Sequence, residues 1–101
     1  MVTIRIKDHV GRCYSNHDGK IIQAVLKKNL QSGKTIIVSF NDIGGVTSSF
    51  VNTAFIELLN EYDFSYIKKS IRFVNSTKQI NDMIKSRFAF ETQRRRNLQV
   101  V

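Results

Sequence analysis

A nearly unbroken apolar run is the feature that most limits how this chain can fold. It extends from Ile36 to Phe40 and leads into a Gly44-Gly45 turn and then a Thr47-Ser48-Ser49 cluster. The run is too short to cross a membrane and is rich in β-branched residues, so it predicts a strand buried on both faces. The hydroxyl cluster is typical of a helix start, where backbone N–H groups lack partners. A strand–turn–helix unit of this kind is typical of parallel α/β folds, which keep their sites at the carboxyl ends of the strands.

Apolar spacing predicts further elements on both sides of this unit. Residues 2–6 alternate apolar and polar side chains, which is typical of a strand with one exposed face. The remaining predicted elements are a short second strand at 12–14, helices over 20–31, 50–62 and 78–90, and a strand over 71–74. Strands that alternate with helices imply right-handed crossovers and a mostly parallel sheet, which the leading hairpin would make mixed. The predicted fold class is therefore α/β, with about four strands and three helices in the order β-β-α-β-α-β-α, and one sheet face better covered than the other.

Length and charge limit the domain organisation and the partners. The 101 residues suit one domain over 1–92, followed by a basic tail over 93–101 that we expect to be flexible. The net charge is +8, but the excess is +4 in each half: seven basic minus three acidic residues in 1–50, and nine minus five in 51–101. The one dense cluster is Arg94-Arg95-Arg96, and no RNA-recognition or zinc-finger motif is present. We therefore expect these arginines to make at most non-specific contacts with polyanions such as nucleic acid.

Residue types that carry chemistry are sparse in this chain. Cys13 is its single cysteine, which excludes an internal disulfide and fits a reducing compartment. His9 and His17 lie in turn-like segments without a metal-ligand spacing. The chain also lacks an apolar run of membrane-spanning length and a signal-peptide core. We predict a cytoplasmic protein without membrane association, metal or cofactor, and no catalytic activity, because no set of nucleophile, base and oxyanion donors can be assembled.

The order of the elements and the hydroxyl cluster resemble the STAS fold. That fold includes the anti-sigma-factor antagonists and the cytoplasmic tails of sulfate transporters. In the antagonists the corresponding segment reads roughly Asp-Ser-Ser-Gly-Leu-Gly, and its first serine is phosphorylated by a kinase of the histidine-kinase ATPase type. On that motif, Thr47 takes the Asp position, Ser48 falls on the phosphorylated serine, and Ser49 is the next serine. Thr47 in place of Asp removes an acidic neighbour of the serine, and Phe50-Val51-Asn52 in place of Gly-Leu-Gly add bulk beside it.

A second group of STAS-like proteins is more similar still. The segment from Val46 to Asn52, with Ala54-Phe55, is similar to small prokaryotic STAS-like proteins of unassigned function. Those proteins have a hydroxyl-Ser-Phe helix start and an Asn after the following strand, where this chain has Asn75. The resemblance covers about residues 18–90 and concerns the fold more than any activity.

The resemblance implies a non-enzymatic regulatory protein-interaction module similar to an anti-sigma-factor antagonist. Its phosphoacceptor would be Ser48, and its partner a histidine-kinase-type ATPase or another regulator. The partner would dock on a surface that comprises Asp42, Thr47, Ser48, Ser49, Phe50 and Asn52. A simpler interpretation is that Thr47 or Ser48 only caps the helix, which contributes about 1 kcal/mol. The charge suggests an alternative from a different class: a small basic phage or mobile-element protein that inhibits a host nucleic-acid-processing system by binding protein or nucleic acid.

The end of the chain leaves two outcomes open. Leu98, Val100 and Val101 follow the three arginines and carry aliphatic groups that little in a monomer would cover. The segment is either disordered, which terminal position and adjacent like charges favour, or it packs on a partner or on a second copy in a homodimer. Strand-like pairing of residues 98–101 at an exposed sheet edge would be one form of such packing.

Overall fold

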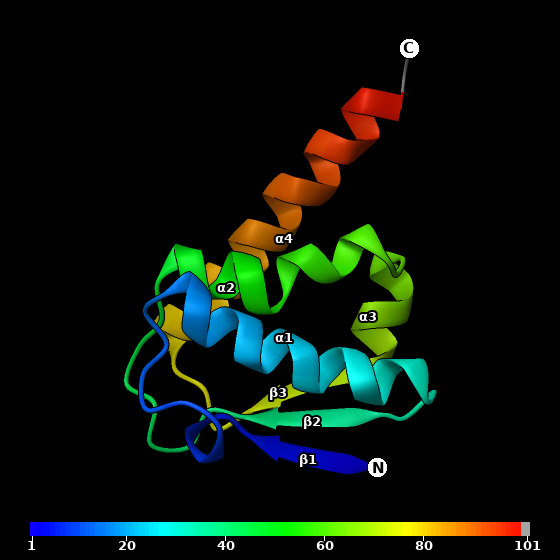
Figure 1. The fold of residues 1–101 in the computed structure, drawn as a ribbon. Helices are drawn as coiled ribbons and strands as arrows, with labels where there is room; N and C mark the ends of the chain where they lie inside the picture. Colours follow the sequence, from blue (N-terminus) through cyan, green and yellow to red (C-terminus); the bar gives the residue numbers. More distant parts are fainter. Residues whose placement is uncertain (100–101) are drawn as a thin grey trace.

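The computed structural model describes residues 1–99 and contains three strands and four α-helices in that range (Figure 1). Two 3₁₀ segments, η1 and η2, complete the order of elements. This order is β1 (Val2–Arg5), η1 (Ile6–Asp8), α1 (Asn16–Gln31), β2 (Ile36–Ser39), α2 (Ser48–Ala54), η2 (Ile56–Asn60), α3 (Phe64–Ser70), β3 (Ile71–Val74) and α4 (Lys78–Gln99). None of the helices in this range combines the length and the apolar character needed to cross a membrane.

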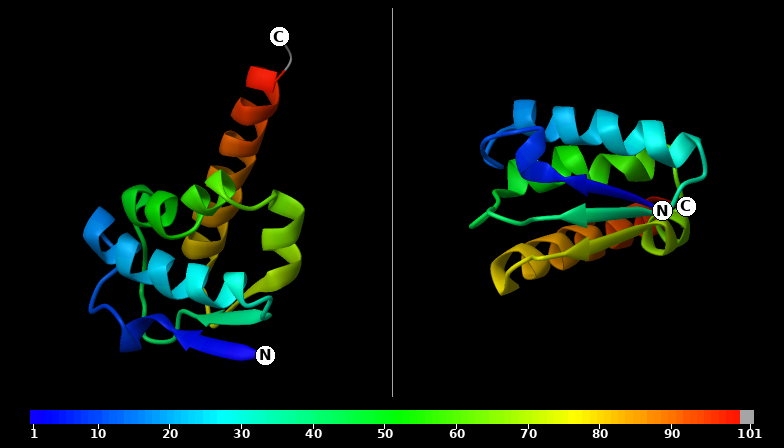
Figure 2. Two further views of the ribbon diagram at one scale, coloured as in Figure 1. Left: turned by 45° about the vertical axis from the view of Figure 1, so that its right-hand side comes forward. Right: turned by 90° about the horizontal axis from the view of Figure 1, so that it is seen from below.

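The sheet is parallel throughout and is covered by helices on one face (Figures 1 and 2). Its strand order is β1-β2-β3, with Ile36 of the central strand opposite Val2 on one side and Ile71 on the other. Side chains that alternate along the strands therefore have two different environments. Ile4 and Val38 are buried beneath the helices, whereas residues of the other face, such as Arg72, are exposed.

Aromatic rings form the centre of the core between the sheet and the helices. Phe40, Phe50 and Phe55 are fully buried. The Phe55 ring lies edge-on to Phe50, with 6.0 Å between centroids, and to Phe73 of β3, with 5.1 Å. Edge-to-face pairs at these separations add to the stabilisation that burial alone provides. Phe50 and Phe55, which lie in the segment predicted as the second helix, are therefore core residues.

Three predicted features of the sheet and its first loop are wrong. The second strand at residues 12–14 is absent, because the carbonyls of Cys13 and Tyr14 accept hydrogen bonds from Thr47 instead of from a neighbouring strand. The sheet of residues 1–99 is therefore parallel with three strands, not mixed with four. β2 is not fully buried on both faces either, since Ile37 lies half-buried on the face without helices.

The helical half also differs from the prediction. The helix expected over 50–62 ends at Ala54, and Phe55, with a φ of −120°, separates it from the 3₁₀ segment η2. Apolar side chains point inward from both segments, so their spacing did not reveal the break. A fourth helix, α3, follows Asp63 and was not predicted.

α4 continues well beyond Phe90 and projects away from the sheet (Figures 1 and 2). The segment predicted as a flexible tail, 93–101, is helical as far as Gln99, and residues 100–101 lie outside the described part of the chain. Ion pairs of Glu91 with Arg94 and Arg95, three and four residues further on, offset the repulsion among the arginines. The predicted pairing of residues 98–101 with the sheet edge thus falls partly outside the described residues, and Leu98 itself is helical and exposed.

The close packing of α1 on α2 depends on a glycine. A Cβ placed on Gly19 would lie 2.8 Å from Cβ of Thr53 and 3.0 Å from the Phe50 carbonyl oxygen. These atoms belong to, or adjoin, the backbone of α2, so they cannot rotate away. Gly19→Ala should lower the free energy of unfolding by about 1–2 kcal/mol, because the overpacking outweighs alanine's better helix propensity.

The measurement is the free energy of unfolding of Gly19→Ala in urea, with Gly11→Ala as the control variant. A Cβ placed on Gly11 would meet no atom within 4 Å, and Gly11 does not have a positive φ, so its replacement should change stability by less than about 0.5 kcal/mol. A Gly19→Ala protein as stable as the parent would contradict the close contact between α1 and α2.

Candidate functional site

The carboxyl ends of the three strands bring together polar side chains from distant parts of the sequence. Ser39, the last residue of β2, accepts a hydrogen bond at its hydroxyl from the Asn75 amide at 3.0 Å. Asn75 follows β3 and has a φ of 54°, a left-handed conformation that Asn tolerates better than most residues. Asn75 therefore connects the carboxyl ends of β2 and β3 at the edge where the sequence predicts a site.

Asp42 lies at the same edge but is held by an arginine. Its carboxylate is 2.8 Å from the Arg5 guanidinium at the end of β1, and Asp8 lies 3.5 Å from the same guanidinium. Asp42 also has a positive φ of 65°. The hydrogen bond of this carboxylate within residues 1–99 is to Arg5.

The three hydroxyl residues at the start of α2 have different roles. Thr47 is the N-cap: its hydroxyl accepts a hydrogen bond from the Phe50 N–H at 3.2 Å and donates one to the Tyr14 carbonyl at 2.9 Å. Ser48 and Ser49 are the first residues of α2, and both are exposed. Neither hydroxyl makes a hydrogen bond within the described part of the chain. The cap and the accessible serine are thus two different residues.

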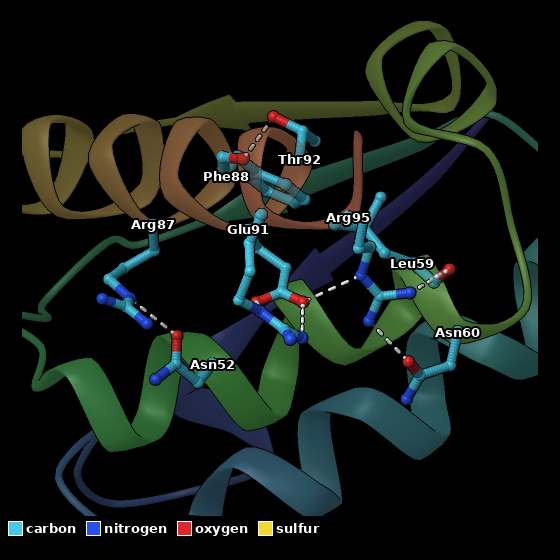
Figure 3. Close-up of polar contacts among 9 residues, drawn as sticks. Asn52, Leu59, Asn60, Arg87, Phe88, Glu91, Thr92 and Arg95 are labelled. Atoms are coloured by element: carbon cyan, nitrogen blue, oxygen red, sulfur yellow. Dashed lines mark hydrogen bonds and ion pairs between the residues drawn. The ribbon is translucent and has the colours of Figure 1, made fainter. Parts of the chain in front are cut away.

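The remaining members of the predicted surface have different environments. Phe50 is fully buried, so its ring belongs to the core and is not presented to a partner in this conformation. Asn52 is half-buried, and its side-chain oxygen accepts a hydrogen bond from Nε of Arg87 at 2.9 Å (Figure 3). The Arg87 guanidinium also lies over the Phe90 ring, 4.9 Å from its centroid. Because Asn52 is one helical turn from Ser48, this contact places a cation close to the Ser48 surface.

Arg87 was not identified from the sequence. It lies 35 residues from Asn52, and no local pattern indicates that pairing. Asn52, Arg87 and Glu91 line a hollow of about 250 Å³ between α2 and α4. The hollow extends from Asn52 on α2 to Arg94 and Arg95 at the basic end of α4, and no local sequence pattern connects these two regions.

Glu91 organises the arginine cluster at the end of α4. Its carboxylate accepts hydrogen bonds from Arg94 at 2.6 Å and from Arg95 at 2.9 Å, and Arg95 also donates to the Leu59 carbonyl at 3.2 Å and to Asn60 (Figure 3). The hydrogen bond from Arg94 is the main factor that lowers the pKa of Glu91, with Arg95 adding to it against the effect of burial. Two of the three arginines proposed for polyanion contact are therefore already paired within the chain.

The remaining reactive groups considered from the sequence are one thiol and two imidazoles. Burial raises the pKa of the Cys13 thiol to about 11, with a further contribution from the nearby charge of Asp18, so the thiol stays protonated at neutral pH. His9 and His17 are exposed. Across residues 1–99, no group of three His, Cys, Asp or Glu side chains lies close enough to hold a metal ion.

The pairing of Glu91 predicts a pH-dependent contribution to stability. The folded-state pKa lies below the ordinary value of 4.5, so the stabilisation is present above that pH and is lost as the pH falls through the lower, folded-state pKa. Glu91→Gln should therefore be less stable than the parent at pH 7, and the difference should shrink in acid below about pH 4.

Urea midpoints at pH 7, 4 and 3 provide the measurement, with Glu57→Gln as the control for loss of a surface carboxylate. Glu57 is exposed and forms no ion pair among the described residues. A stability difference between Glu91→Gln and the parent that stays constant with pH would contradict the pairing.

Comparison with known proteins identifies one family. Residues 18–81 match the family described as STAS-like domain of unknown function (DUF4325). The matched segment extends from α1 into the first turn of α4 and includes β2, the Thr47–Ser49 helix start and β3. No curated protein and no solved structure matches the chain.

Proposed function

Because this chain belongs to the family of STAS-like domains of unknown function, we propose that it is a regulatory protein-interaction module without catalytic activity. The surface around Ser48 is the docking site of its protein partner in this proposal. The observation that carries it is the placement of Ser48: exposed, at the start of α2, and with the capping role taken by Thr47.

The division of roles between Thr47 and Ser48 supports a modifiable serine. Modification of the Thr47 hydroxyl would remove the proton that it donates to the Tyr14 carbonyl. Here the Phe50 N–H bonds to Thr47, so a phosphoryl group on Ser48 would leave the cap intact. Phe50 replaces glycine relative to the antagonists, but its bulk is directed into the core and does not obstruct this surface.

Charge gives such a modification its effect on a partner. Phosphorylation would add a charge of about −1.5 to −2 near neutral pH. The N–H groups of the first turn of α2 and the Arg87 guanidinium, held one turn away by Asn52, favour a negative group here. A partner that recognises the neutral surface would meet a different one after modification. The kinase implied by the STAS resemblance is of the histidine-kinase ATPase type.

The basic-inhibitor hypothesis is a second proposal with less support. It rests on the net charge of +8 and on the arginine cluster of α4. Arg94 and Arg95 already pair with Glu91, which reduces the charge that they present to a polyanion. Any contact of this kind should weaken steeply as salt rises, because phosphate contacts release counterions.

Two measurements on the native protein test the regulatory proposal. Phosphopeptide mass spectrometry of the chain isolated from its native host should find phosphate on Ser48. Affinity purification from the same host should recover a partner whose binding changes by about tenfold or more in Ser48→Asp, because a charge at the centre of an interface acts strongly.

Ser65→Asp is the matched control, since Ser65 is an exposed serine in the first turn of α3. Ser48→Ala should change stability by less than about 0.5 kcal/mol, because Thr47 caps the helix. Unchanged partner binding in both Ser48 variants, together with an unmodified Ser48, would refute the phosphorylation switch. Helix capping would then be the remaining role of this hydroxyl cluster.

A further inference from the structure

An apolar groove of about 560 Å³ lies beside β3, between α3 and α4. Ile71 and Phe73 of β3 form its base, Ile67 lies on the α3 side, and Ile84 and Phe88 lie on the α4 side. Ile67, Ile71, Ile84 and Phe88 are each no more than 5% exposed, so they form the floor and walls of the groove, whose volume lies within the usual range of binding pockets. The start of α2 contributes no residue to it, so the groove is separate from the Ser48 surface.

The edge of the sheet forms part of this groove. β3 is the last strand in the order β1-β2-β3, and one of its edges has no strand beside it within residues 1–99. The Val74 carbonyl accepts a hydrogen bond from the Phe40 N–H across to the β2 side. Because successive residues of a strand direct their backbone groups to opposite sides, those of Phe73 point to the free edge. An unpaired edge of this kind accepts an added strand.

The groove also has a charge preference. Lys68 and Lys85 belong to its lining, from α3 and α4 respectively, and no acidic side chain does. The Lys68 ammonium group lies 5.4 Å from the centroid of the Phe64 ring, which keeps the charge at the groove. An occupant with acidic side chains would pair with these lysines, and a basic occupant would be repelled.

Charge also argues against a second copy of this chain as the occupant. The exposed aliphatic residue nearest the end of α4 is Leu98, and it follows Arg94, Arg95 and Arg96. A partner copy that inserted this end would bring like charge to Lys68 and Lys85, in a protein with a net charge of +8. The groove therefore fits a segment from an acidic protein better than its own basic helix end.

We propose that this groove binds an extended acidic segment of another protein, which adds to the sheet as a fourth strand beside β3. Every second side chain of the segment would face the groove, with apolar ones over Phe73 and Phe88 and acidic ones beside Lys68 and Lys85. This surface does not depend on Ser48, so failure of either proposal leaves the other standing.

The test uses the full chain and a labelled peptide in which every second residue, the set that faces the groove, is valine and glutamate in turn, with threonine at the positions between. Fluorescence polarisation follows its binding. A second peptide replaces each glutamate with lysine, and a third carries N-methyl groups that block pairing with the strand edge. The protein variant Ala89→Glu places an acid in the groove, and Ala24→Glu is the matched control on the exposed surface of α1.

The glutamate peptide should bind the parent and Ala24→Glu equally, and Ala89→Glu about tenfold more weakly or worse. The lysine and N-methyl peptides should bind the parent about tenfold more weakly than the glutamate peptide. Circular dichroism verifies that Ala89→Glu is folded, and the double variant Lys68→Glu/Lys85→Glu should reverse the preference between the glutamate and lysine peptides.

Three results would overturn the proposal. The first is equal binding of the glutamate and lysine peptides, which removes the charge preference. The second is undiminished binding of the N-methyl peptide, which removes the strand pairing. The third is a dimer of the parent chain, detected by analytical ultracentrifugation, that Ala89→Glu dissociates and Ala24→Glu does not, since the occupant would then be a second copy.

Discussion

The packing of all helices on one face of a small parallel sheet determines the rest of this structure. A three-stranded sheet offers little area, so the helices above it must approach each other closely to exclude water from the core. Gly19 permits this where α1 meets α2, since a Cβ there would lie 2.8 Å from Thr53. The fully buried rings of Phe40, Phe50 and Phe55 then fill the space between the helices and the strands.

The same arrangement creates the two surfaces that we propose as docking sites. At the carboxyl edge of the sheet, the α2 start turns Phe50 inward and Ser48 outward, because Thr47 fixes the first turn. At the side, β3 has no further strand beside it within residues 1–99, and α3 and α4 flank its free edge (Figure 2). The roles proposed for both surfaces rest on recognition, with Arg87 and Lys68 as the charges that bias each surface.

Sequence patterns predicted the elements in which the spacing of apolar residues agrees with the side chains that are buried in the folded protein. The strands at 2–6, 36–40 and 71–74 and the helix start at Thr47 follow this rule, and the family match confirms the resemblance drawn from Val46–Asn52. The pairing of Glu91 with Arg94 and Arg95 was accessible in principle, because its spacing of three and four residues is a helix signal.

The remaining features depend on contacts between distant residues. The segment at 12–14 alternates like a strand, but its Cys13 and Tyr14 carbonyls accept hydrogen bonds from Thr47. No sequence pattern near Cys13 indicates that contact. The break at Phe55 is hidden because both halves bury apolar side chains. The Asn52–Arg87 hydrogen bond, which brings a cation to the Ser48 surface, spans 35 residues and leaves no local signal.

The central claim is that this chain acts by presenting the Ser48 surface to a protein partner. Photo-crosslinking in the native host tests it most directly, with a photoreactive side chain placed at Ser49 and, as a control, at Ala24, which is exposed on α1. We expect one discrete crosslinked partner from position 49, none from position 24, and a changed yield when Ser48→Asp is added. Absence of a crosslink at position 49, or the same products from both positions, would contradict it.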